Sequence, residues 1–175
     1  MKTGNGCSRA ALLIAGLGGG CVRADAQRPF AMPAVSTAVV DFLTADEIAA
    51  QQRTLLVQAI AAPGGSAGIT LAKYSGHLTM MTVRVKSGGA EFHKKNNDIF
   101  VAVDGEATVV TGGTLVDPHI SSADEIVGTR LEGGVAHVMH KGDIIHIPVN
   151  TPHQTVVGPG KTFTYYVVKV VEPGS

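Results

Sequence analysis

Residues 142–153 read GDIIHIPVNTPH and are the most informative segment of this chain. A glycine opens the segment, a short apolar run follows, and prolines at 148 and 152 precede His153. A short apolar run bounded by glycine and proline is typical of a buried β-strand that enters a turn. We therefore expect a strand, a proline-kinked turn and a histidine placed directly after that turn.

A second informative segment, residues 88–105, reads GGAEFHKKNNDIFVAVDG. Glu91 and His93 are two residues apart, so on a strand their side chains point to the same face. Asp98 opens the next apolar run. Two imidazoles with one or two carboxylates on converging strands suit a borderline divalent ion such as Fe, Mn, Ni or Zn.

The pattern around these segments predicts an all-β domain. After Ser66 the apolar residues recur with a period of two in short runs, and many of the 22 glycines and 8 prolines punctuate them. Such runs favour a β-sandwich or barrel, and Gly105 is predicted to form a tight turn between two strands. The predicted strands are 78–86, 99–104, 106–111, 135–140, 143–148, 153–157 and 162–171.

Both segments resemble the two motifs of the cupin superfamily, and the resemblance covers residues 78–171. The second motif matches Gly142, Pro148 and His153, with Asn150 in place of the family's glycine. The first motif reads Glu-x-His…Asp where the family has His-x-His…Glu, and it ends on Gly105. The resemblance implies a small antiparallel β-barrel, also called a double-stranded β-helix.

The resemblance further implies that Glu91, His93, Asp98 and His153 hold a metal inside the barrel. Two carboxylates would make this set harder and more anionic, which favours Mn or Fe over Cu. The alternative is that these side chains hydrogen-bond one another in a polar lumen without an ion, since buried polar groups need partners. His146 lies in the same segment, either lining the lumen beside the site or on the outer face, because a one-residue change of register reverses its direction.

The first 26 residues are predicted to be a signal peptide. Lys2 and Arg9 precede an apolar stretch over residues 10–20, and Ala24-Asp25-Ala26 offers small residues before a cut at Gln27. A lipoprotein cut before Cys21 is the alternative. The cut after Ala26 predicts a periplasmic or secreted protein without cysteine and with a net charge of −2, in place of the full chain's +0.

The remaining chain divides into an N-terminal arm and helix over residues 27–65 and a barrel over residues 66–175. Thr44 and Glu47 form a capping-box pattern that predicts the start of the helix, and the Pro63-Gly64-Gly65 sequence predicts its end. We expect the helix to pack against the barrel.

These features define the expected function. Neutral charge argues against nucleic acid as a partner, and no segment beyond the signal is long and apolar enough to span a membrane. We expect a secreted cupin that binds a divalent metal and a small-molecule ligand or substrate; as an enzyme it would be a metal-dependent oxygenase, isomerase or lyase. The alternative is a metal-free binding or structural cupin, and the resemblance also implies a homodimer.

Overall fold

The computed structural model describes residues 40–174. The predicted signal peptide, its cut site and residues 27–39 of the arm lie outside this range. One helix, α1 (Ala45–Ala61), begins at the predicted cap: the Glu47 backbone N–H donates to Thr44 Oγ1 at 3.2 Å, and Glu47 Oε2 accepts from the Thr44 backbone N–H at 2.8 Å. The helix ends two residues before Pro63, where the sequence predicted its end.

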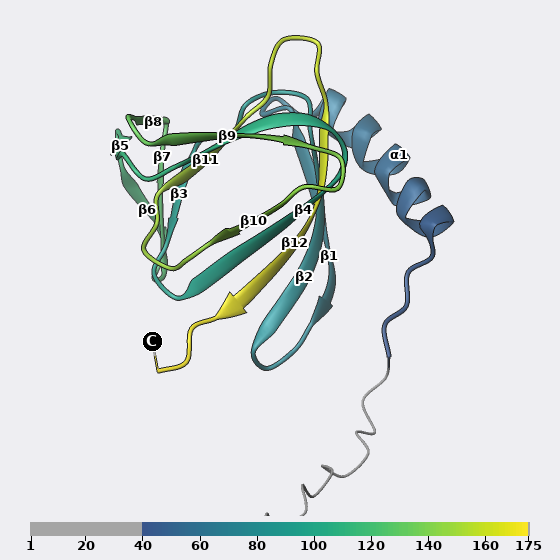
Figure 1. Cartoon of the computed structure of the whole chain (residues 1–175), viewed down its shortest axis with the longest axis horizontal. Coiled ribbons are helices and arrows are strands. Elements are labelled where there is room, and N and C mark those ends of the chain that lie inside the picture. The colour runs from purple at the N-terminus through teal and green to yellow at the C-terminus, as the bar shows by residue number, and fades with distance from the viewer. Residues whose placement is uncertain (1–39, 175) are drawn as a thin grey trace, which may run out of the picture. The chain divides into compact units, whose positions relative to one another are not determined.

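All strand pairs are antiparallel, and the main sheet follows the order β1-β2-β12-β4-β11-β3-β7-β6, with β9 and β10 also paired to β4. Figure 1 shows this sheet curling over, with β5 and β8 as a separate ribbon at one end. This is the all-β antiparallel barrel with an N-terminal helix that the sequence predicted. The strands are β1 (Ser66–Lys73), β2 (His77–Arg84), β3 (Ala90–His93), β4 (Asn96–Thr111), β5 (Thr114–Val116), β6 (His119–Ser122), β7 (Glu125–Gly128), β8 (Arg130–Glu132), β9 (Val135–His140), β10 (Ile144–Ile147), β11 (His153–Val156) and β12 (Phe163–Val171).

The prediction of a tight turn at Gly105 was wrong. β4 runs through this residue without a break, and Gly105 adopts φ +80° opposite Phe163 of β12. Before Gly105 the strand pairs with β10 and β12, and after it with β9 and β11. A Cβ at this position would collide with the Thr162 carbonyl, so glycine permits the bend that carries one strand from one side of the barrel to the other.

Several strands escaped prediction because they lack a buried alternating face. β5, β6, β7 and β8 are three or four residues long, and β6 is exposed along its whole length. β1 has no fully buried residue either. Periodicity detects a strand through the face that it buries, so these elements carry little signal.

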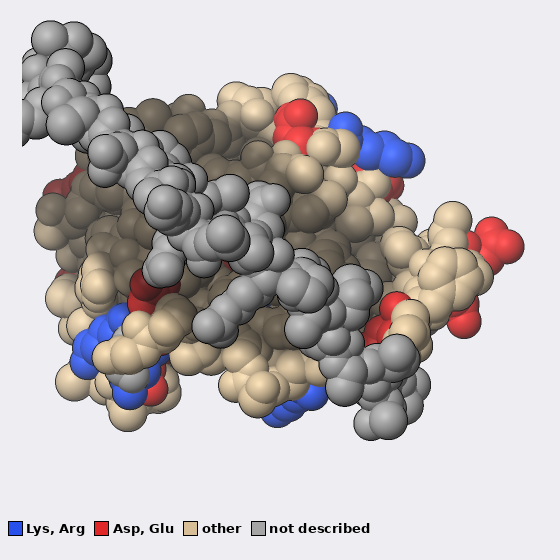
Figure 2. Space-filling view, turned by 60° about the horizontal axis from the view of Figure 1, so that its bottom comes forward, with Lys and Arg blue, Asp and Glu red and all other residues tan. Residues whose placement is uncertain are grey.

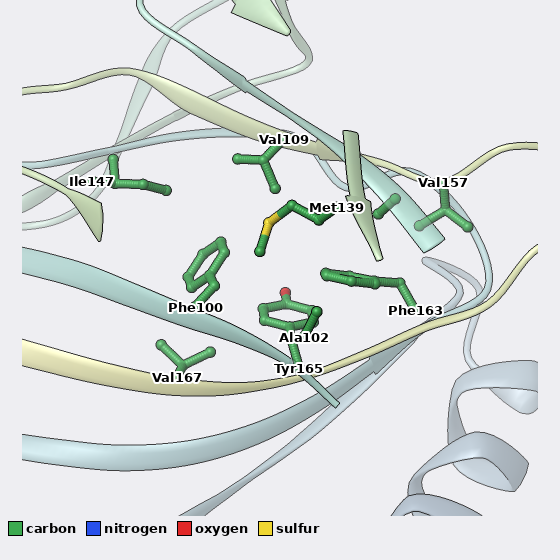
Figure 3. Close-up of a cluster of buried hydrophobic side chains, with 10 residues drawn as sticks. Phe100, Ala102, Val109, Met139, Ile147, Val157, Phe163, Tyr165 and Val167 are labelled. Atoms are coloured by element: carbon green, nitrogen blue, oxygen red, sulfur yellow. The ribbon is translucent and has the colours of Figure 1, made fainter. Parts of the chain in front are cut away.

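The interior of the barrel contains an apolar core in which the other buried side chains surround Met139. Figure 3 shows Phe100, Tyr165 and Phe163 on one side of this methionine and Val109 on the other. Phe163 and Val109 are completely buried, and the Phe100 and Tyr165 rings lie 4.9 Å apart. Along the inward face of β4 and β12, the polar residues Asp98 and Lys169 lie next to the core residues Phe100 and Val167.

A second, smaller core joins the helix to the outer face of the sheet. Leu55 and Ala59 of α1 pack on Met81 and Val83 of β2, all of them buried. Figure 1 shows α1 lying along β1 and β2. Because Met81 and Val83 point outward, Met80, Thr82 and Arg84 of the same strand point into the barrel.

Candidate metal centre

Three strands bring the predicted metal ligands together inside the barrel. Glu91 and His93 lie on β3, His153 opens β11 directly opposite Glu91, and Asp98 lies on β4. One ligand atom from each of these residues lies within 4.8 Å of the others. We call Glu91, His93, Asp98 and His153 the lumen cluster.

Three of the four residues in the lumen cluster are buried, which is unusual for such polar groups. His93, Asp98 and His153 are 5%, 1% and 3% exposed, whereas the Glu91 side chain keeps 34% of its surface. A buried charge is retained only where partners compensate its lost hydration. The contacts of each side chain therefore show which groups compensate its charge.

The His153 ring presents an unpaired nitrogen to the cluster. Its Nδ1 lies 3.1 Å from the Thr151 carbonyl oxygen, which can only accept, so Nδ1 carries a proton and, in the neutral ring, Nε2 carries the lone pair. Nε2 is buried without a hydrogen-bond partner and faces Asp98 Oδ2 at 3.5 Å and Glu91 Oε2 at 3.8 Å. A backbone carbonyl that fixes the tautomer in this way is the usual support of a metal-ligating histidine.

His93 is surrounded by both signs of charge. Its Nε2 lies 3.3 Å from Asp98 Oδ2 and 3.5 Å from Glu91 Oε2, and its Nδ1 lies 3.4 Å from Glu125 Oε1. Lys169 of β12 places its Nζ 2.8 Å from the same His93 Nε2. The two carboxylates favour a proton on His93 Nε2. A hydrogen bond from the Lys169 ammonium would instead require the unprotonated nitrogen.

The pKa shifts follow from these contacts. Burial alone would lower the pKa of His93, but its hydrogen bonds to Asp98 and Glu91 outweigh burial and raise it to about 9. Burial would raise the pKa of Glu91, yet the hydrogen bond to His93 and the nearby positive groups lower it to about 2. The pKa of Asp98 is held well below its usual range against the effect of burial, through both histidines and Lys169. Both carboxylates are therefore ionised at neutral pH, as metal ligands must be.

A cavity of about 320 Å³ reaches the lumen cluster from the β1–β2 side of the barrel; its lining includes Glu91, Asp98 and Lys169. Arg84 and Tyr165 also line it, and the Arg84 Nε donates to the Tyr165 hydroxyl at 3.0 Å. The other lining residues are Ser66, Gly68, Met80, Thr82, Phe100 and Val167. We call this cavity the chamber.

A larger groove of about 790 Å³ lies on the opposite face of the sheet, against α1. Leu43, Ile48, Met81 and Tyr166 contribute its apolar wall. The lumen cluster takes no part in its lining. Convergent charged side chains therefore make the smaller cavity the candidate functional site.

Other histidines singled out by the sequence lie away from the lumen cluster. His146 is exposed and its neighbour Ile147 is buried, so the register places His146 on the outer face of β10. His137 and His140 of β9 are exposed as well. Their ring nitrogens contact Thr111, Glu106 and Asp143 rather than the cluster.

Lys169 is the main residue of the site that sequence analysis missed. It pairs with Asp98 across β12 and β4, and its Nζ donates to Asp98 Oδ2 at 3.0 Å and Oδ1 at 3.1 Å. The sequence did contain a signal, because side chains two residues apart on a strand point to the same face. Lys169 is two residues from Val167 and four from Tyr165, and both of these are buried inside the barrel. A lysine near the end of an apolar strand suggests a solvated terminus, which hid this role.

The surface of the described part of the chain adds two observations. On the face drawn in Figure 2, basic and acidic side chains lie in small separate groups, with no extended patch of one sign. Within residues 40–174, no helix has the length and hydropathy needed to cross a membrane.

Comparison with known proteins finds similarity in structure but not in sequence. No protein-family model and no curated protein matches the chain. The polyketide cyclase RemF from Streptomyces resistomycificus is 18% identical over 63% of this chain and 68% of its own, with a TM-score of 0.44. A Cupin 2 conserved barrel domain protein from Salinispora arenicola is 18% identical over 61% and 76%, with a TM-score of 0.43. A cupin-like protein from Thermotoga maritima is 13% identical over 60% and 68%, with a TM-score of 0.44.

Proposed function

We propose that this chain is a secreted cupin that binds a divalent ion of Mn, Fe, Ni or Zn in its lumen cluster and a small molecule in the chamber. The observation that carries the proposal is the buried, unpartnered Nε2 of His153 aimed at two ionised carboxylates. A buried polar atom without a partner is rare and calls for an explanation. A cation between His153, Asp98 and Glu91 would supply one.

The donor set fits such an ion. Imidazole nitrogens suit Zn, Ni and Fe, and carboxylate oxygens suit Mn, so His93 and His153 with Glu91 and Asp98 can serve all four. An ion bound there would polarise an oxygen of a bound molecule as a Lewis acid. The chain's own contribution is to hold His153 in one tautomer through Thr151 and to keep the carboxylates ionised.

The chamber supports the small-molecule part of the proposal. Its volume of about 320 Å³ is at the lower end of the range for ligand pockets. Phe100 and Val167 offer apolar surface, and the Arg84 guanidinium, whose Nη2 lies 3.7 Å from Glu91 Oε1, adds polar N–H groups to the lining. The chamber therefore suits a compact molecule with an apolar body and a polar group.

Metal analysis tests the proposal. The full chain, purified without added metal, is assayed for bound ions by mass spectrometry and then titrated with Mn²⁺, Fe²⁺, Ni²⁺ and Zn²⁺ after chelation. We expect binding in the wild type, its loss in His93→Ala and His153→Ala, and no change in the matched control His146→Ala, whose side chain is exposed. A wild type that binds none of these ions, with unchanged thermal stability on their addition, would refute the metal site.

A second function, a metal-free cupin that binds a small molecule or has a structural role, is favoured by Lys169. Its ammonium already compensates Asp98 without an ion. This function predicts stabilisation by small molecules in the presence of chelator. A homodimer is a separate prediction, measured by the solution mass of the protein.

Secretion is proposed from the sequence alone. Sequencing the N-terminus of the protein recovered from its natural host tests it, with Gln27 as the expected first residue. A lipid-modified Cys21 would instead establish the alternative cut.

A further inference from the structure

Lys169 places its ammonium against atoms that a metal ion in the lumen cluster would need. Its Nζ lies 2.8 Å from His93 Nε2 and donates to both Asp98 oxygens at 3.0 and 3.1 Å. A cation that belongs to the chain itself therefore already lies against two of the proposed ligands. His153 Nε2, the third buried ligand atom, is left over.

A divalent ion and this ammonium cannot hold the same atoms together. Metal ligands approach to about 2.0–2.2 Å, and the nitrogen lone pair of His93 can serve one partner at a time. Like charges side by side in a buried site repel strongly, because the interior screens them less than water does. From this geometry, and resting on the metal site proposed above, we propose that Lys169 is a tethered cation that competes with the divalent ion, so that metal binding displaces its ammonium into the chamber.

The backbone around Lys169 restricts how this exchange occurs. β12 is paired along its length with β2 on one side and β4 on the other, where Lys169 faces Leu78 and Asp98. The strand therefore stays in place, and the exchange is a rotation of one flexible side chain. Lys169 lines the chamber and keeps 21% of its side chain exposed, so the displaced ammonium has space and water beside it.

In this arrangement the lumen cluster contains the Lys169 ammonium when the protein is metal-free and the divalent ion when metal is bound. The metal-free protein keeps Asp98 compensated by Lys169, which explains how a carboxylate that is 1% exposed is tolerated there. The same contact lowers the apparent affinity for a divalent ion, because binding must first break it. Removing the lysine should therefore weaken the metal-free protein and strengthen metal binding.

The test measures Mn²⁺ binding and thermal stability of the full chain after chelation, in the wild type, Lys169→Met and Lys169→Gln. Mn²⁺ is the probe because it is a hard ion that a thioether does not bind. The control is Lys95→Met, which removes a lysine whose partner is Asp124, at 3.6 Å on the surface. We expect both Lys169 variants to bind Mn²⁺ about tenfold or more tightly than the wild type, the scale on which a neighbouring like charge disfavours a bound cation.

Stability provides a readout that does not depend on affinity. Without metal, both Lys169 variants should melt below the wild type, and Mn²⁺ should raise their melting temperature more than it raises that of the wild type or Lys95→Met. Equal or weaker Mn²⁺ binding in both Lys169 variants would overturn the inference. If the variants bind Mn²⁺ and the wild type does not, the competition is established and the proposed metal-dependent function is refuted. If none of the proteins binds it, both fail.

Discussion

The charge of Asp98 is expected to stabilise the metal-free protein through its contacts with Lys169 and His93, and Asp98→Asn tests this. The substitution keeps the shape of the side chain and removes its charge. Asp98 is 1% exposed, accepts two hydrogen bonds from Lys169 and lies 3.3 Å from His93 Nε2. An asparagine would turn an N–H donor toward these donors and leave the lysine without its counter-charge.

The cost can be worked out from this geometry. Removing one partner of a buried ion pair costs about 3–5 kcal/mol. The Lys169 side chain is 21% exposed and can turn toward water, so we expect the lower end, about 3 kcal/mol. A domain with about 5–15 kcal/mol of stability would still fold with this loss.

Urea denaturation followed by circular dichroism, at pH 7 and with chelator, measures the loss directly. Asp124→Asn is the control: this carboxylate is 42% exposed beside Lys95, and a surface pair contributes about 1 kcal/mol or less. A loss in Asp98→Asn no larger than that of the control would refute the reasoning.

A pH series adds a second measure of the same charge. The pKa of Asp98 is lower in the folded protein than in the unfolded chain, so its stabilisation is present above about pH 4 and is lost as pH falls through the folded pKa. The acid loss of stability should therefore be shallower in Asp98→Asn than in the wild type. Equal acid dependence in both proteins would contradict the assigned role of Asp98.

Three further predictions concern the bend of the barrel, its core and its metal chemistry. Gly105→Ala should prevent or severely weaken folding, because the added Cβ would collide with the Thr162 carbonyl and φ is +80°. Gly142→Ala should cost only about 1 kcal/mol, because φ is +94° there but the space around it is open. Urea midpoints of the two variants measure the difference, and similar losses would contradict the close approach at Gly105. Phe163→Ala should cost about 3–5 kcal/mol because the ring is completely buried, against about 0.5 kcal/mol for the exposed Ile144→Ala; a Phe163→Ala loss below 1 kcal/mol would contradict the core assignment. The affinity for Mn²⁺ should rise with pH and level off above about 9, because protons compete for His93 until its raised pKa is passed; calorimetry from pH 6.5 to 8.5 measures this, and a flat profile would contradict a His93 ligand.

Local patterns predicted the elements that depend on local physics. The α1 cap needs only Thr44 and Glu47, which are three residues apart, and both were identified from the sequence. The strands β11 and β12 were located within one residue at each end, because each buries an alternating or continuous apolar face. β9 was located equally well, although Met139 is its one buried residue. The short strands β5 to β8 left no comparable signal.

The lumen cluster was predicted through the spacing of two motifs and a family resemblance. Period two places Glu91 and His93 on one face of β3, as the structure shows. Whether these side chains meet Asp98 and His153 depends on how β3, β4 and β11 pair. No spacing within one strand contains that information.

The sequence by itself therefore determined the class of fold, the helix boundaries and the residue types available for a metal site, because these follow from short-range periodicity and capping. Only the tertiary structure decided the directions and the partners. The register of β10 turned His146 outward, the bend at Gly105 made one strand of two predicted ones, and the pairing of β12 with β4 put Lys169 onto Asp98. Pairing joins residues 71 positions apart in the chain, and it is set by the barrel closing around its core rather than by either segment alone.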